Sequence, residues 1–313
     1  MLDSVRERLI RLDHSARRWL IGGVRILVGL LWLANLHWKV PTSFGEDTGR
    51  GLYKYTAAAA VNAPLAPFRW LIEQVVLPNF QLFGWFTLLS ETTVAALLLI
   101  GYRTKIVALI GASLTVPIML SVIYYPGGDE WAWSYLLMIG IHLLLIGSDA
   151  GAHLGLDGVL SGPPEAAAPA LRTIGIVAAV VGVLGLFVAR SIDVTGRTVA
   201  LLGSDAGFVN ADGTITRRWE LKLLFFNPLW AVLTIVGGVL LILGARRVWA
   251  AWSAVALFSA MTVIVFVSQT FDYARDDGTL QKISTGTNMA AWGACALAGA
   301  LLVRRRCAEP SPA

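Results

Sequence analysis

Charged residues and cysteines are both scarce in this chain of 313 residues. Charged residues make up 14% of the sequence and hydrophobic residues 56%, whereas a soluble domain normally carries ~25% charged residues. This composition excludes an ordinary soluble domain and indicates an integral membrane protein. The two cysteines, Cys295 and Cys307, lack the C-x-x-C spacing of a redox or metal pair.

Histidine is rare as well, with four residues in the chain. A haem held by two histidines in a helix bundle needs both at matching depth. His37 stands at the outer end of one expected span, and His142 stands toward the inner end of another. His14 and His153 fall outside the spans. No nucleotide-binding or iron–sulfur motif is present, so the sequence predicts no intrinsic cofactor and no metal site.

Long apolar runs dominate what remains. A helix crosses ~30 Å of hydrocarbon with about 20 residues, and runs of this length occur eight times. We therefore expect an all-α integral membrane protein with about eight transmembrane helices in two four-helix bundles. The expected domains are residues 1–160 and 161–313. The expected spans are 19–38, 80–100, 106–124, 131–148, 171–190, 228–245, 248–268 and 287–303.

Lysine and arginine gather at one set of span ends. By the positive-inside rule these ends are cytoplasmic, and both termini are expected on that side of the cell membrane. The expected partner of the chain is the lipid bilayer. In a membrane protein the net charge of +5 does not indicate a nucleic-acid partner. The residues that set the orientation include Arg17, Arg18, Arg103, Lys105, Arg172, Arg246, Arg247, Arg304, Arg305 and Arg306.

Two long segments separate spans on the outer side. In residues 39–79, bulky apolar side chains around Trp70 have the spacing of short helices that lie at the membrane interface. Residues 191–227 are compatible with a small β-hairpin that turns at Asp212 and Gly213. An irregular surface loop fits the same segment.

The two halves of the chain follow the same order of elements: a span, a long outer loop, two spans joined by a short basic turn, and a fourth span. The turn in ALLLIGYRTKIVALIGASL resembles that in VLLILGARRVWAAWSAVAL, with Gly101 aligned to Gly244. Either a parallel duplication or the general likeness of apolar hairpins explains this pattern. In this alignment Glu91 corresponds to Thr234, so membrane-embedded chemistry is expected in the first half.

Glu91 stands in the middle of the second expected span, where an ionised side chain costs ~2.5–3.5 kcal/mol. It shares a small and polar helix face with Gly84 and Thr87, and this face should point into the bundle. The expected partner is Arg25 in the first span, with His142 in the same layer. Glu91, Arg25 and His142 thus form a candidate catalytic group. The alternative is a buried ion pair that only sets helix register.

The fourth expected span carries a stripe of Trp131, Tyr135, Met138 and His142 at helical spacing. Such a stripe would suit a flat ring such as a quinone head group, with Trp131 and Tyr135 as candidate binding residues. The same spacing is typical of helix packing with Trp131 in the interfacial aromatic belt. Both interpretations stay open.

Several motifs occur in a fixed order in the first half of the chain. They are Arg25, HWKVP with Lys39, Glu91 followed by LLLIGYRT, DEW formed by Asp129, Glu130 and Trp131, and HLGLD ending at Asp157. In this order of motifs, residues 15–160 resemble the DoxX superfamily. The resemblance is stronger to its DoxD branch, the membrane subunit of thiosulfate:quinone oxidoreductase.

The resemblance implies a four-helix membrane bundle linked to sulfur oxidation, quinone reduction or the assembly of redox complexes. Lys39 would then help to handle anion or quinone, Asp129 and Glu130 would form an outer substrate site, and other redox-complex subunits would be partners. The chain adds four further spans to the family pattern. Two functions remain: a quinone-linked oxidoreductase subunit with quinone as bound substrate, and a non-enzymatic scaffold or small-solute carrier.

Overall fold

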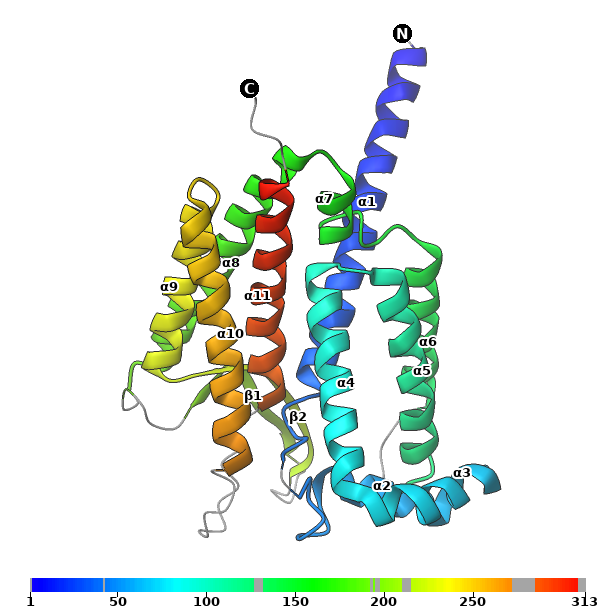
Figure 1. The fold of residues 1–313 in the computed structure, drawn as a ribbon. Coiled ribbons are helices and arrows are strands. Elements are labelled where there is room, and N and C mark those ends of the chain that lie inside the picture. Colours follow the sequence, from blue (N-terminus) through cyan, green and yellow to red (C-terminus); the bar gives the residue numbers. More distant parts are fainter. Residues whose placement is uncertain are drawn as a thin grey trace. The chain divides into compact units, whose positions relative to one another are not determined.

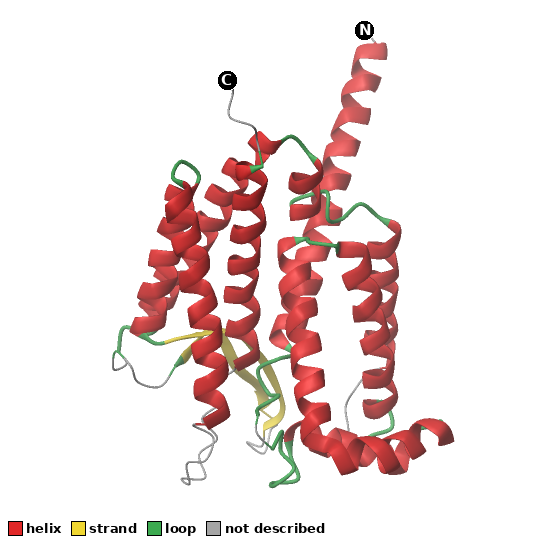
Figure 2. Ribbon diagram, in the orientation of Figure 1, coloured by secondary structure: helices red, strands yellow, loops and turns green. Residues whose placement is uncertain are grey.

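Helices make up most of the protein in the computed structural model (Figure 2). The chain divides into two compact units, which are 1–32 with 44–164 and 33–43 with 165–313 (Figure 1). The structure describes residues 2–41, 43–126, 132–191, 194, 198–209, 215–271 and 285–308.

Four long helices form the first unit. Their contacts close a ring. Helix α4 packs on α5, and α5 packs on α6. Helix α1 completes the ring, because Gly29 lies against Leu99 of α4 and Trp32 forms a hydrogen bond with His142 of α6. The first four expected spans are therefore helical, and the first helix begins well before residue 19. The bounds are α1 Leu2–Ala34, α4 Phe80–Ile100, α5 Thr104–Val122 and α6 Ala132–Gly147.

Short helices precede α4, as the sequence predicts. They are α2 Gly51–Asn62, α3 Ala66–Leu71, a π-helical turn Ile72–Val76 and a 3₁₀ turn Leu77–Asn79. Ala59, Ala63 and Ile72 form a small buried core among these elements. Figure 1 shows α2 and α3 running across one end of the α4 and α5 helices.

The second unit holds a second ring of four helices, in which α8 packs on α9, α9 on α10, α10 on α11 and α11 on α8. Glycines let two of them approach closely, because a Cβ on Gly238 would lie 2.5 Å from the backbone nitrogen of Ala179. The last four expected spans are therefore helical. The bounds are α8 Ala167–Val188, α9 Pro228–Gly244, α10 Val248–Phe271 and α11 Thr285–Cys307.

A two-stranded antiparallel sheet precedes α9, so the hairpin is confirmed over an irregular loop. Strand β1 spans Val199–Val209 and β2 spans Ile215–Phe226. The predicted turn residues, Asp212 and Gly213, lie outside the described residues. The buried side chain of Asn288 in α11 binds β2: its Oδ1 accepts from the Phe225 nitrogen at 2.9 Å, and its Nδ2 donates to the Phe225 carbonyl at 2.8 Å.

The chain is a multi-pass helical membrane protein. In the part of the chain that the structure describes, five helical segments are long and apolar enough to cross a bilayer. Two of the expected spans, in α6 and α9, form shorter apolar helices. Eight crossings therefore remain a prediction. The five segments are Ala66–Ile100, Thr104–Val122, Pro164–Val188, Val248–Val267 and Gly286–Cys307.

Candidate functional site

Arg25 is fully buried and reaches the end of α4. Its guanidinium donates hydrogen bonds to the backbone carbonyls of Leu98, of Leu99 at 3.1 Å, of Ala150 at 3.2 Å and of Leu154 at 2.7 Å. The last carbonyls of a helix have no partner within the helix, and a cation there also complements the helix dipole. Arg25 therefore ties α1, α4 and the loop after α6 together through main-chain acceptors.

Asp157 completes the same cluster from helix α7, Leu156–Ser161. Its Oδ1 accepts from the backbone nitrogen of Arg103 at 2.7 Å, and its Oδ2 accepts from that of Thr104 at 3.0 Å. The carboxylate thereby satisfies free N–H groups at the start of α5, as a capping side chain does. The backbone nitrogen of Asp157 donates to the Gly101 carbonyl at 2.9 Å. The HLGLD motif thus folds back onto LLLIGYRT.

Gly101 is required by this geometry. It ends α4 in the left-handed conformation with φ of 65°, which glycine adopts without strain. A Cβ at this position would lie 2.7 Å from Cζ of Arg25 and 2.7 Å from Cα of Gly155. The glycine of LLLIGYRT is therefore explained by close packing.

The predicted pairing of Arg25 with Glu91 is wrong. Glu91 is fully buried in the middle of α4, but the guanidinium binds the carbonyls of Leu98 and Leu99, about 10 Å further along the helix at ~1.5 Å per residue. The predicted inward direction of Glu91 is confirmed, because Gly84 and Thr87 on its face are also buried.

His142 is fully buried but lies away from Arg25. Its Nε2 accepts from Trp32 Nε1 at 3.0 Å, and its Nδ1 donates to the Met138 carbonyl at 2.7 Å. This network defines a neutral ring with the proton on Nδ1. Trp32 follows Arg25 by seven residues, or about 10 Å along α1, so the predicted common layer is wrong. Both nitrogens serve internal contacts, and Gly111 of α5 packs against the ring.

The structure describes two further predicted site residues, Tyr135 in the first unit and Lys39 in the second. Tyr135 is half-buried in α6. Lys39 is buried, donates to the Asn35 carbonyl at 2.9 Å and lies 4.1 Å from the centre of the Trp38 ring. No group of three or more potential metal ligands occurs in the described part of the chain. The predicted residues Asp129, Glu130 and Trp131 lie outside the described residues.

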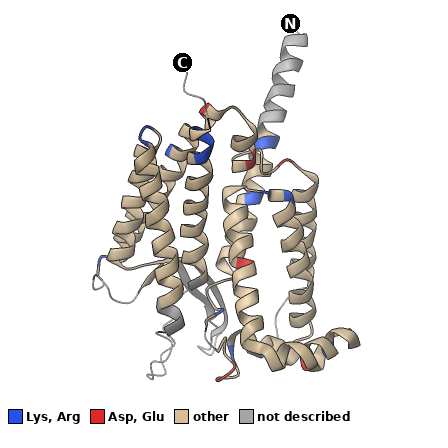
Figure 3. Cartoon of the chain, in the orientation of Figure 1, with Lys and Arg blue, Asp and Glu red and all other residues tan. Residues whose placement is uncertain are grey.

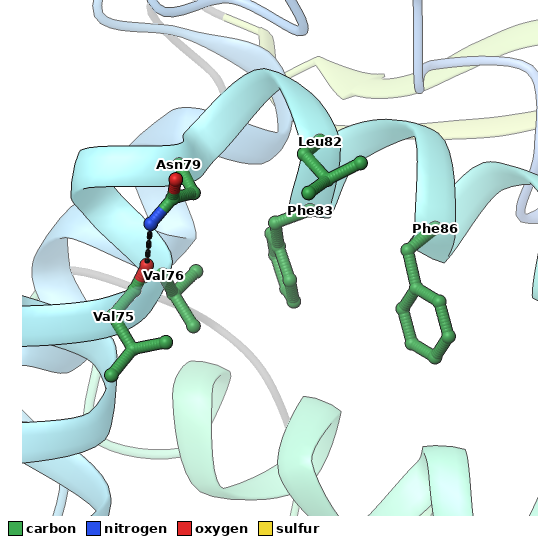
Figure 4. A pocket seen from close by; sticks show the side chains of 6 residues that line it. All are labelled: Val75, Val76, Asn79, Leu82, Phe83 and Phe86. Atoms are coloured by element: carbon green, nitrogen blue, oxygen red, sulfur yellow. Dashed lines mark hydrogen bonds between the residues drawn. The ribbon is translucent and has the colours of Figure 1, made fainter.

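An apolar groove that the sequence did not predict lies at the bend into α4 (Figure 4). Its volume is about 440 Å³. Asn79 stands at its edge, where its Nδ2 donates to the Val75 carbonyl at 2.9 Å and its Oδ1 remains an acceptor. Bulky apolar residues on both sides of a proline are the sequence signal for such a bend. The lining residues are Val75, Val76, Asn79, Leu82, Phe83 and Phe86.

A second, more polar pocket of about 260 Å³ adjoins this groove and shares Asn79 and Leu82 with it. Glu46 and Gln81 supply further polar groups to the pocket. A polar pocket beside an apolar groove matches an amphipathic molecule, with its head in one and its chain in the other.

The fold and these features define a multi-pass helical membrane protein with a buried carboxylate in its first unit. Residues 54–166 match the family model DoxD, described as TQO small subunit DoxD, which confirms the resemblance. The match contains Glu91, His142 and Asp157, whereas Arg25 and Lys39 precede it. Comparisons with curated proteins and with solved structures found no match.

Proposed function

We propose that this protein is the membrane subunit of a quinone-linked redox system related to thiosulfate:quinone oxidoreductase. The observation that carries the proposal is the match of residues 54–166 to the TQO small subunit. Quinones reside in the bilayer, so an enzyme that reduces them needs a part within the membrane. In this role the chain works with other subunits, which pass electrons from a donor outside the membrane.

The groove and Glu91 are the candidate parts for this role. The groove side chains, such as Phe83 and Phe86, suit the apolar tail of a quinone, and the adjoining pocket suits its polar head. Reduction of a quinone to a quinol takes two electrons and two protons. Glu91 is an ionisable group on the inward face of α4, about 15 Å along the helix from Gln81 of the polar pocket. In this proposal it is a proton source that reaches the quinone head through a relay and not by direct contact.

Quinone binding tests the proposal directly. The full-length protein in phosphatidylcholine nanodiscs is titrated with decylubiquinone, and quenching of tryptophan fluorescence is followed. We expect saturable binding that weakens about tenfold in Phe83→Ala, while Leu109→Ala, at a side chain of α5 that is 56% exposed, binds as the wild type does. Quenching that rises linearly and equally in all three proteins would contradict the proposal.

Glu91→Gln separates proton transfer from binding. It preserves side-chain size and cannot titrate, so the variant should bind quinone normally. In membranes that contain the partner subunits, we expect thiosulfate-dependent quinol formation to fall at least tenfold. An unchanged rate would exclude the carboxylate as the proton donor.

A non-enzymatic scaffold is the second candidate function. It is favoured by Arg25 and His142, whose polar atoms bind groups of the protein itself. A scaffold predicts that Glu91→Gln leaves quinol formation unchanged. It also predicts that loss of the chain lowers the amount of the assembled redox complex, which co-purification of its subunits measures.

The orientation in the membrane belongs to the same proposal. With both termini cytoplasmic, reporter fusions after residues 104 and 247 should give a cytoplasmic signal, and a fusion after residue 205 should give an external one. A cytoplasmic signal at residue 205 would overturn this topology.

A further inference from the structure

Arginines gather at one end of the helix ring in the second unit. Arg172 lies in the second turn of α8, and Arg246 and Arg247 form the turn between α9 and α10. The last turn of α11 carries three consecutive arginines, 304–306. Figure 3 shows these blue segments at the same end of the four helices. Nη1 of Arg306 donates a hydrogen bond to the carbonyl of Gly244 at the end of α9. The end of α11 therefore lies beside the turn between α9 and α10.

Four of these side chains face outward: Arg172, Arg246, Arg247 and Arg304 are exposed. Each guanidinium offers a planar set of N–H donors that fits two oxygens of a phosphate. Among the described residues of this end, Glu165 just before α8 is the acidic one. The surface therefore has a strong positive charge.

An exposed apolar layer adjoins the arginines. Leu243, in the last turn of α9, is 48% exposed, and Trp249 and Trp252, in the first two turns of α10, are 64% and 40% exposed. Tryptophan is enriched where head groups meet acyl chains. Arginines above exposed tryptophan and leucine match the order of groups in a phospholipid, with phosphate first and acyl chains below it.

We propose that this arginine cluster, formed by Arg172, Arg246, Arg247 and Arg304, is a binding site for anionic phospholipid. Anionic head groups are favoured over zwitterionic ones because a choline or ethanolamine cation is repelled by the neighbouring guanidinium groups. The site lies in the second unit, outside the segment that matches DoxD, and it is independent of the proposed quinone chemistry.

Native mass spectrometry of the full-length protein tests the proposal. The protein is exchanged from micelles that contain equal amounts of phosphatidylglycerol and phosphatidylcholine, and the retained lipids are counted. We expect wild-type protein to retain phosphatidylglycerol preferentially, and the Arg246→Gln/Arg247→Gln variant to lose that preference about tenfold or more. Arg190→Gln is the matched control, because Arg190 is exposed just beyond the other end of α8 and should leave the preference intact.

The competition with salt and phosphate identifies the ligand. The preference should weaken when the salt concentration rises from 0.05 to 0.5 M, because exposed charges are screened over about 4 to 14 Å in this range. It should persist in 10 mM inorganic phosphate. Equal retention of both lipids by the wild type, or equal loss in Arg190→Gln, would overturn the proposal. Displacement by 10 mM phosphate would show a site for soluble anions instead of lipid.

Discussion

The indole nitrogen of Trp32 lies 3.0 Å from Nε2 of His142, and this hydrogen bond joins α1 to α6. A neutral histidine has one acceptor nitrogen, and Trp32 occupies it. The other nitrogen is bound to the Met138 carbonyl. A buried ring with both nitrogens engaged holds two helices in register, and proton transfer would require breaking one of these bonds.

The first prediction concerns this bond. His142→Phe leaves the Trp32 N–H buried without an acceptor and should lower the free energy of unfolding by about 1–3 kcal/mol. Trp32→Phe should cost a similar amount. The double variant should lose less than the sum, by at least 0.5 kcal/mol. Denaturant unfolding in detergent measures the four proteins, with Trp133→Phe, at a side chain of α6 that is 62% exposed, as the control.

The second prediction uses two glycines with nearly the same positive φ. Gly101 and Gly49 have φ of +65° and +64°, but a Cβ would meet Arg25 at Gly101 and nothing within 4 Å at Gly49. Gly49→Ala should therefore cost about 1–2 kcal/mol, the strain of the left-handed conformation alone. Gly101→Ala should cost clearly more, about 3 kcal/mol or above. Equal losses in thermal stability would show that Arg25 moves aside at no cost.

The third prediction follows from the separation of Arg25 and Glu91. Because the guanidinium binds carbonyls near Leu98 and Ala150, Arg25→Gln and Glu91→Gln should destabilise the protein independently. Their effects on the free energy of unfolding should add within ~0.5 kcal/mol. The four proteins of this double-mutant cycle are compared by denaturant unfolding in the same detergent. A coupling free energy above ~1 kcal/mol between Arg25 and Glu91 would indicate that the two side chains form an ion pair, and it would contradict the structure.

The fourth prediction concerns Asn288, whose amide both donates to and accepts from the backbone of Phe225. Asn288→Leu removes both bonds and should cost about 2–4 kcal/mol. Asn288→Asp keeps the acceptor, but it places a carboxylate oxygen opposite the Phe225 carbonyl, so it should be as harmful or worse. Limited proteolysis of the hairpin between β1 and β2 reports the loss locally. Unchanged cleavage in both variants would contradict a role of Asn288 in anchoring β2.

The sequence predicted the helices well, because their signals are local. An apolar run fixes the place of a helix to within a few residues, as for 80–100 and α4, Phe80–Ile100. For residues 191–227 the Asp212–Gly213 pair indicated a hairpin turn, but an irregular loop fitted the same segment until the pairing of β1 with β2 decided between them. The inward direction of Glu91 followed from the small residues on its own helix face. This inference also uses a single segment and requires no information about the other helices.

The partners of the buried polar groups could not be predicted in this way. The sequence places a side chain in depth only relative to the expected ends of its span, and an error of one or two turns at such an end gives the side chain another neighbour. Arg25 also binds the loop around Ala150, which is 125 residues away in the chain and whose folding back onto α4 has no local signal. The groove at the bend into α4 likewise depends on how the preceding helices turn.

The sequence by itself therefore determined that this is a multi-pass helical protein with a carboxylate inside its first unit, because hydrophobic length and helix periodicity are properties of single segments. Only the tertiary structure decided that Arg25 binds the end of α4 and that Asp157 binds the start of α5. It also decided that the hydrogen-bond partner of His142 is Trp32. The physical reason is that helix rotation and register are set by close contacts between segments. Examples are Gly29 against Leu99 and Gly111 against His142, and no single segment encodes such contacts.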